Sequence, residues 1–465
     1  MINSSIFKAY DIRGIYGKDI DEDGIEQISK AIYTFFVKKL GKQDLKIVLG
    51  CDMRISTPSL FERSKKTFAE AGATVIDVGL VATPTLYFAS LHYDYDGGVM
   101  ITASHNPKEY NGLKFVVRQG NKLLKIGKES GMEEVKNIAL QKQFLPLKAS
   151  GKIIKRENVV KDEIEKSLSH FDFSKMKKLK IIIDSANGMG ILYLNEIFKH
   201  IPADIIRMNE KLDGTFPAHE ANPLKFETLK DIQKKIVEEK ADLGIAPDAD
   251  GDRIFFLDEK GQIIPAAMTT SIIADQVLEK NPGELILVDI RYIRNVQKVV
   301  KDRGGKISIS KVGHALITKQ MADEDGIFAG ESSGHYFFRE TGYAENSGMV
   351  VLYVLNAMNR ENKPLSEIVR KYHSSPESGE VNFELSKGTN VKALLSDIEK
   401  GYTDGESSWL DGLSVTYPDW RFNIRTSNTE PLMRLNVEAA NDSLVKEKFE
   451  ELKKKIMASG ATMKS

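Results

Sequence analysis

The sequence has one cysteine, no excess of either charge and no long apolar run, and each shortage excludes a class of protein. Cys51 alone cannot form an internal disulfide or a thiolate-cluster metal site. The 66 lysines and arginines balance 66 aspartates and glutamates, so no net field draws the chain to nucleic acid or to a membrane surface. No stretch approaches the roughly 18 apolar residues that span a bilayer, and the first residues lack the layout of a signal peptide. We therefore expect a cytoplasmic globular protein.

The chain of 465 residues is too long for one hydrophobic core, and a repeated pattern indicates several α/β domains. Short apolar β-type runs end in aspartate at 46–52, 180–184, 243–248 and 285–289, and helical periodicity follows. Such units predict mainly parallel sheets covered by helices, with ligands bound at the carboxyl ends of the strands. Breaks at 145–158 and 373–380 divide the chain, and the alternating pattern beyond the second break predicts an α+β terminal domain.

The stretch "ITASHNP" (101–107) follows a short apolar run, which predicts a buried strand that ends in a polar loop. An ordinary turn would use the same residues, because Ser104 and Asn106 can bond nearby backbone and Pro107 fixes its φ angle. The loop alone does not decide between a turn and a reactive serine.

The stretch "PDADGDR" (247–253) carries three aspartates at alternate positions. In an extended loop, Asp248, Asp250 and Asp252 would point to one side and could converge on a hard cation. A calcium EF-hand is the sharper alternative, but Arg253 stands where that loop needs glycine and the flanks are strand-like. A nicotinamide-dependent enzyme is the other alternative, and it fails because "GMG" (188–190) lacks the third glycine of the dinucleotide fingerprint.

Three further loops carry groups that bind phosphate and hydroxyls. In "RTSNTEP" (425–431), Arg425 can grip a phosphate in bidentate fashion while the short polar residues after it complete a cradle. In "GESSGH" (330–335), a carboxylate between glycines is suited to sugar hydroxyls. In "VGHAL" (312–316), a histidine follows another short strand. Each loop taken alone is also compatible with a plain turn.

Together and in this order, "ITASHNP", "DADGDR", "GESSGH" and "RTSNTEP" resemble the four active-site loops of the α-D-phosphohexomutase superfamily. The N-terminal "FKAYDIRG" (7–14) resembles its phosphomannomutase/phosphoglucomutase branch, and the resemblance runs from about residue 6 to residue 435. It implies a heart-shaped α/β chain of four domains, three similar mixed α/β domains and a C-terminal α+β domain. The expected domains are 1–150 with a phosphoserine loop, 151–258 with a metal loop, 259–373 with a sugar-binding loop and 374–465 with a phosphate-binding loop.

The resemblance also implies reversible transfer of a phosphoryl group between O1 and O6 of a hexose, through a phosphoserine and a 1,6-bisphosphate intermediate. Glucose or mannose 1,6-bisphosphate would act as activator and one Mg²⁺ would bind per chain. The implied metal ligands are the phosphoryl group on Ser104 with Asp248, Asp250 and Asp252. The implied catalytic residues are Ser104, His105, Lys114, Arg13, Arg253 and His335. The implied substrate-binding residues are Tyr10, Arg253, Arg291, His314, Glu331, Ser333, His335, Arg425, Ser427, Asn428 and Thr429.

Sugar preference and the general base are less defined. Transfer needs a base near neutral pH, and His335 and Lys114 are the two candidates. Arg291 stands where this branch often has lysine, and Ser332 where a larger residue is common. We expect mannose phosphate as substrate, with glucose phosphate also accepted. The alternatives are a phosphoglucosamine mutase, whose N-terminal motif usually differs, and a glucose-restricted phosphoglucomutase; protein partners cannot be predicted.

Overall fold

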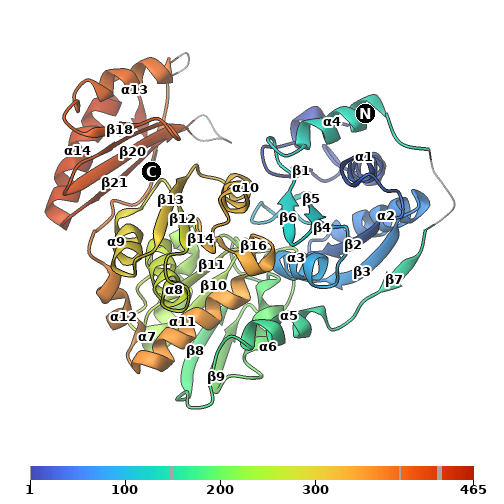
Figure 1. Cartoon of the computed structure of the whole chain (residues 1–465), viewed down its shortest axis with the longest axis horizontal. Helices are drawn as coiled ribbons and strands as arrows, with labels where there is room; N and C mark the ends of the chain where they lie inside the picture. Colours follow the sequence, from blue (N-terminus) through green and yellow to red (C-terminus); the bar gives the residue numbers. More distant parts are fainter. Residues whose placement is uncertain (1, 147–150, 387–388, 427–431, 465) are drawn as a thin grey trace.

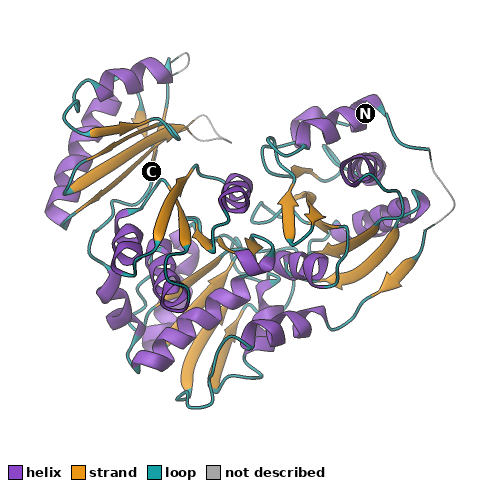
Figure 2. Cartoon of the chain, in the orientation of Figure 1, coloured by secondary structure: helices purple, strands orange, loops and turns teal. Residues whose placement is uncertain are grey.

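The computed structural model describes residues 2–146, 151–386, 389–426 and 432–464, which form four sheets, each with its own helices (Figures 1 and 2). The first and fourth sheets lie at opposite ends of the molecule, and the second and third lie between them (Figure 1). This is the four-domain α/β architecture that the resemblance implied. The exact domain boundaries at 150, 258 and 373 stay predictions. Within the described ranges, no helix is long and apolar enough to cross a bilayer.

The first sheet has seven strands in the order β1-β5-β4-β2-β3-β7, with β6 beside β5. They are β1 (Ile12–Ile15), β2 (Lys46–Cys51), β3 (Thr74–Leu80), β4 (Gly97–Ile101), β5 (Tyr110–Gln119), β6 (Lys122–Lys125) and β7 (Ile153–Lys155). The helices are α1 (Glu22–Leu40), α2 (Thr57–Glu70), α3 (Thr83–His92) and α4 (Met132–Gln141). Strands β2 and β4 run parallel, so the loops that follow them emerge at the same edge of the sheet. The break expected at 145–158 contributes an edge strand, because β7 pairs with β3.

The second and third sheets share one hydrophobic core. The second, in the order β11-β10-β8-β9, comprises β8 (Leu179–Asp184), β9 (Ala203–Met208), β10 (Leu243–Pro247) and β11 (Ile254–Leu257), with α5 (Val159–Leu168), α6 (Gly190–Ile197) and α7 (Lys230–Glu239). The third, β13-β12-β14-β15-β16, comprises β12 (Leu285–Asp289), β13 (Lys306–Ser310), β14 (Phe328–Gly330), β15 (Tyr336–Phe338) and β16 (Ala344–Glu345). Its helices are α8 (Ala266–Lys280), α9 (Arg294–Asp302), α10 (His314–Glu324), α11 (Ser347–Glu361) and α12 (Leu365–Tyr372). Ile183 of β8 and Val354 of α11 belong to one continuous buried cluster, so these two domains form a single base for the site.

The fourth sheet is antiparallel and has its own core, as the alternating pattern predicted. Its order is β18-β19-β20-β21-β17-β22. The strands are β17 (Val381–Glu384), β18 (Glu406–Ser408), β19 (Leu413–Thr416), β20 (Trp420–Thr426), β21 (Leu432–Ala439) and β22 (Thr462–Met463), and the helices are α13 (Val391–Glu399) and α14 (Asp442–Ala458). Phe422 and Val437, on paired strands, are fully buried in this core. Glu438 of β21 accepts hydrogen bonds from the backbone of Ile293 and Arg294 (both 2.9 Å), which joins this domain to the start of α9.

Candidate active site

Ser104 lies in the loop after the buried strand β4, as predicted. Its φ angle is 51°, a left-handed conformation that is uncommon for a residue with a side chain. The backbone N–H donates to Thr102 Oγ1 at 2.9 Å, and Oγ lies 3.1 Å from His105 Nδ1. Only 1% of Ser104 is exposed. Unusual backbone conformations of this kind persist where surrounding contacts hold them.

Arg54 supplies the contacts that hold this loop. Arg54 is not among the candidate site residues predicted from the sequence. Its guanidinium donates to four carbonyl oxygens of the loop, those of Ser104 (2.5 Å), Asn106 (2.7 Å), Pro107 (2.8 Å) and Tyr110 (3.0 Å). Its Nε bonds Asp52 at 3.1 Å, and the side chain is fully buried. The sequence pattern could have indicated this residue. If the strands before Arg54 and Ser104 are parallel neighbours, as β2 and β4 are, the loops that follow them lie side by side.

The three aspartates converge, but through a turn and not through the extended loop expected. Gly251 has a φ of +75° and donates to the Asp248 carbonyl at 3.2 Å, which folds the chain back between β10 and β11. Oxygen atoms of Asp248, Asp250 and Asp252 lie within 4.8 Å of one another, and all three side chains are buried. One oxygen of each carboxylate has no hydrogen-bond partner among the described residues. Burial and the neighbouring carboxylates of Asp252 and Asp250 raise the pKa of Asp248 well above its ordinary value. The flanking strands exclude the helix–loop–helix of an EF-hand.

Lys114 of β5 connects the serine domain to these carboxylates. Its Nζ donates to Asp250 Oδ2 at 2.7 Å and to Asp252 Oδ2. Burial opposes the charge of Lys114, but Asp250 and Asp252 outweigh it and raise the pKa of the ammonium. Thr83 Oγ1 also donates to Asp250 Oδ2, at 2.6 Å. Nearby, Arg13 bonds Asp11 Oδ2 at 2.7 Å and reaches the serine loop.

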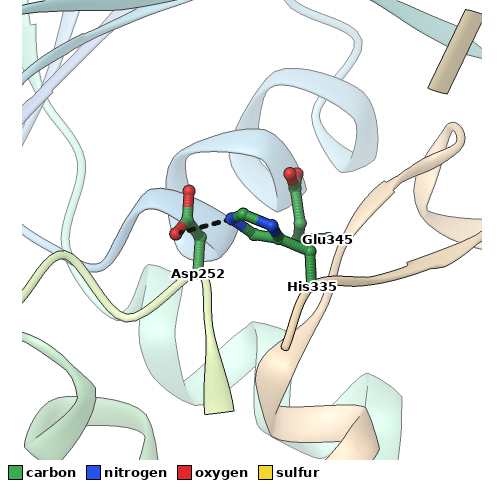
Figure 3. A group of neighbouring side chains, drawn as sticks. All are labelled: Asp252, His335 and Glu345. Atoms are coloured by element: carbon green, nitrogen blue, oxygen red, sulfur yellow. Dashed lines mark ion pairs between the residues drawn. The ribbon is translucent and has the colours of Figure 1, made fainter. Parts of the chain in front are cut away.

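His335, in the loop before β15, lies between two carboxylates. Its Nε2 is 3.3 Å from Asp252 Oδ1 (Figure 3). Its Nδ1 is 2.7 Å from Glu331 Oε2. Burial opposes a charge on the ring, but Asp252 and Glu331 raise the pKa of His335 to about 9. Ser333 Oγ lies 3.1 Å from Nδ1, and the Arg253 backbone N–H donates to Asp248 Oδ1 at 3.1 Å.

Glu345 completes a second group of potential metal ligands with Asp252 and His335 (Figure 3). Both ring nitrogens of His335 already face carboxylates, however, and Glu345 Oε2 forms a buried ion pair with Lys125. A cation there would have to displace an ammonium group. We therefore interpret this group as an ion-pair network that supports His335, and the triad of Asp248, Asp250 and Asp252 as the candidate metal site.

The sugar-binding candidates come from the third domain and from the N-terminal segment. Arg291 bonds both oxygens of Asp289, at 2.9 and 3.1 Å, and its Nη2 is 3.6 Å from Glu331 Oε1. His314 begins α10, and its ring centroid lies 5.3 Å from that of Tyr10. The pKa of His314 is lowered by burial and by Lys125, so this ring is neutral. Its Nδ1 has no partner among the described residues and can bond a ligand.

Arg425 of β20 lies in the fourth domain and donates to Glu380 Oε2 at 2.7 Å. Its Nε is buried without a partner among the described residues. Ser427, Asn428 and Thr429, the other members of the predicted phosphate cradle, lie outside the described residues.

One cleft of about 1600 Å³ brings the predicted residues together. All four domains line it, and the candidates on its wall are Tyr10, Arg13, His105, Arg253, Arg291, His314, Glu331, Ser333, His335 and Arg425. Ser104, Lys114 and the three aspartates are buried beside these residues. A cleft with a buried serine, an acidic triad, hydroxyl-binding groups and a distant arginine defines an enzyme that transfers a phosphoryl group on a polyhydroxylated substrate.

Comparison with known proteins agrees with this class. Models of the four phosphoglucomutase/phosphomannomutase domains match in order: α/β/α domain I at 4–143, domain II at 161–261, domain III at 266–374 and the C-terminal domain at 380–455. The chain therefore belongs to the phosphoglucomutase/phosphomannomutase family, and it is a phosphohexose mutase.

Individual relatives cover nearly the whole chain. A phosphomannomutase of Salmonella montevideo is 36% identical, over 95% of this chain and 96% of its own. A phosphomannomutase of Methanocaldococcus jannaschii is also 36% identical, over 98% and 99%. The crystal structure of a phosphoglucomutase/phosphomannomutase family protein from Burkholderia thailandensis superposes with a TM-score of 0.88 at 29% identity and covers all of both chains.

Proposed function

We propose that the enzyme interconverts mannose 1-phosphate and mannose 6-phosphate, accepts the glucose phosphates as well, and carries the transferable phosphate on Ser104. The observation that carries this proposal is the single cleft in which the Ser104 loop, Arg291 with Glu331, and Arg425 line different walls. A sugar held between them can present one oxygen to the serine while its other phosphate meets the arginine. Relatives named phosphomannomutase support mannose as the preferred sugar.

A divalent cation fits the acidic triad, because the three buried carboxylates converge, and Asp248 and Asp250 each keep an oxygen without a hydrogen-bond partner among the described residues. Asp248, Asp250 and Asp252 would hold it, and an all-oxygen donor set suits Mg²⁺. When bound, the cation would neutralise charge on the phosphoryl group. Around it, this chain supplies Lys114, Arg13 and Arg253 as fixed positive charges, which is most of what phosphoryl transfer asks of a protein.

Lys114 and His335 are suited first to charge neutralisation, since each faces Asp252 and the pKa of each is raised. Either one becomes a proton acceptor for the attacking hydroxyl only once its carboxylate partners are neutralised. These are Asp250 and Asp252 for Lys114, and Asp252 and Glu331 for His335. His105 has the opposite character: burial and neighbouring cations lower its pKa, so beside Ser104 Oγ it is a neutral ring that can exchange a hydrogen bond with the serine.

A comparison of kcat/KM on mannose, glucose and glucosamine 1-phosphates tests the proposal. Glucose or mannose 1,6-bisphosphate is added as activator. We place the reaction in the cytoplasm. We expect the highest value with mannose and a value within about tenfold for glucose, because one inverted hydroxyl changes a few hydrogen bonds. A preference for glucosamine would favour a phosphoglucosamine mutase, and activity on glucose alone a glucose-restricted phosphoglucomutase.

A further inference from the structure

Glu380 is the only described residue that joins three arginines of the cleft. Its Oε2 lies 2.7 Å from Arg425 Nη2 and 3.9 Å from Arg291 Nη1, and its Oε1 lies 3.5 Å from Arg434 Nη1. All four side chains line the same cleft. The carboxylate comes from the segment just before β17, where the chain passes from the third domain to the fourth.

The register of the fourth sheet explains why an anion is needed here. Arg425 of β20 and Arg434 of β21 stand directly opposite each other in the antiparallel ladder. Like charges in this position repel, and Arg291 adds a third positive charge from the neighbouring domain. Asp289 already bonds Arg291. Glu380 places a carboxylate between Arg425 and Arg434, and the nearby arginines lower its pKa against the opposing effect of burial.

Arginine is well suited to a phosphate, because its planar guanidinium can donate two parallel hydrogen bonds to the phosphate oxygens. A phosphate that enters must take over the Arg425 donor that now bonds Glu380. The Nε of Arg425, which has no partner among the described residues, offers a second bond.

We propose that Glu380 is an internal anion that occupies the arginine cluster when no ligand is bound and that exchanges with the non-reacting phosphate of the substrate. This rests on the proposed function, because a mutase that works through a bisphosphate must grip the distal phosphate in each half-reaction and release it between them. Glu380 keeps that grip weak enough for release. It acts through the arginines and is a positioning residue.

The test is titration of inorganic phosphate into the full-length protein by calorimetry, a measurement that needs no turnover. Glu380→Gln should bind phosphate about 10- to 100-fold more tightly than the wild type, as expected when a charge-assisted partner no longer competes. Glu384→Gln makes the same change at an exposed position of β17 and should leave the affinity unchanged. In an Arg425→Ala background, the gain from Glu380→Gln should disappear.

Steady-state kinetics provide the second measurement. Glu380→Gln should lower KM for mannose 1-phosphate and lower kcat, because the bisphosphate leaves its first orientation more slowly. Unchanged or weaker phosphate binding in Glu380→Gln, or a gain that persists without Arg425, overturns the inference. If the wild type turns over none of the three sugar phosphates while Glu380→Gln still binds phosphate more tightly, the proposed substrates are wrong and the anion exchange stands.

Discussion

The guanidinium of Arg54 donates to the carbonyl oxygen of Ser104 at 2.5 Å, and the same side chain bonds three further carbonyls of the loop. The loop of Ser104, the proposed nucleophile, is thus held by an arginine 50 residues earlier in the chain. The contact keeps Ser104 in its left-handed conformation without touching its hydroxyl.

Arg54→Lys should lower kcat by about 10- to 100-fold with little change in KM. Lysine keeps the positive charge but has no planar fork that reaches four carbonyls, and each charge-assisted hydrogen bond contributes about 1.5–3 kcal/mol. Steady-state kinetics measure the effect. Arg63→Lys on α2, at a partly exposed ion pair, is the matched control and should remain near wild type. A fully active Arg54→Lys enzyme would refute the positioning role.

Ser104→Ala should retain the fold and lose several orders of magnitude in turnover, because no other hydroxyl in the described structure occupies this position beside His105. Intact-protein and peptide mass spectra of the wild type should show phosphate on Ser104. Phosphate located on another residue, or near-normal activity of the alanine variant, would contradict the assignment of the nucleophile.

Removal of divalent cations should abolish activity, and Mg²⁺ should restore it. Ca²⁺ should bind but support little transfer, because its larger and looser coordination shell positions a phosphoryl group poorly. Without any turnover, Mg²⁺ should raise the Tm of the wild type, since it relieves repulsion within the triad. Asp250→Asn should lose that shift, and Asp419→Asn, at an exposed position, should keep it. Full activity in excess chelator would exclude the metal site.

Glu163 of α5 should make stability depend on pH. The side chain is fully buried and accepts one hydrogen bond, from Thr85 Oγ1 at 2.6 Å. Burial raises its pKa to about 7, above the ordinary value of 4.5. The protonated form therefore favours the fold: its contribution is complete below pH 4.5 and is lost as the pH rises through 7.

Glu163→Gln keeps the shape and removes the titration. The wild type should lose about 3 kcal/mol of its free energy of unfolding between pH 4.5 and pH 8 through Glu163, and the variant should not. Melting temperatures of both proteins at pH 5, 6, 7 and 8 should diverge by several degrees, with the variant higher at alkaline pH. Parallel curves across this range would show that Glu163 does not titrate near neutrality.

Much of the site was predictable because its residues occupy short loops directly after recognisable strands. The run before Ser104 and the aspartates after β10 indicated both the strands and the proposed chemistry of their loops, and the motifs at 312–316 and 330–335 likewise accompany the short strands β13 and β14. The turn at Gly251 was not predictable in the same way. Alternate spacing indicated convergence, but the backbone achieves it by folding back and not by extending.

What the sequence by itself determined is the order of strands, loops and reactive side chains, since these depend on local periodicity and on motifs a few residues long. Only the tertiary structure decided which charges meet. Arg54 reaches the serine loop, Lys114 reaches two aspartates of the next domain, and Glu380 lies among three arginines from separate strands and loops. Such pairs join residues far apart in the chain, and packing sets the distances between them. The direction of each pKa shift depends on those distances and on burial, which no local pattern contains.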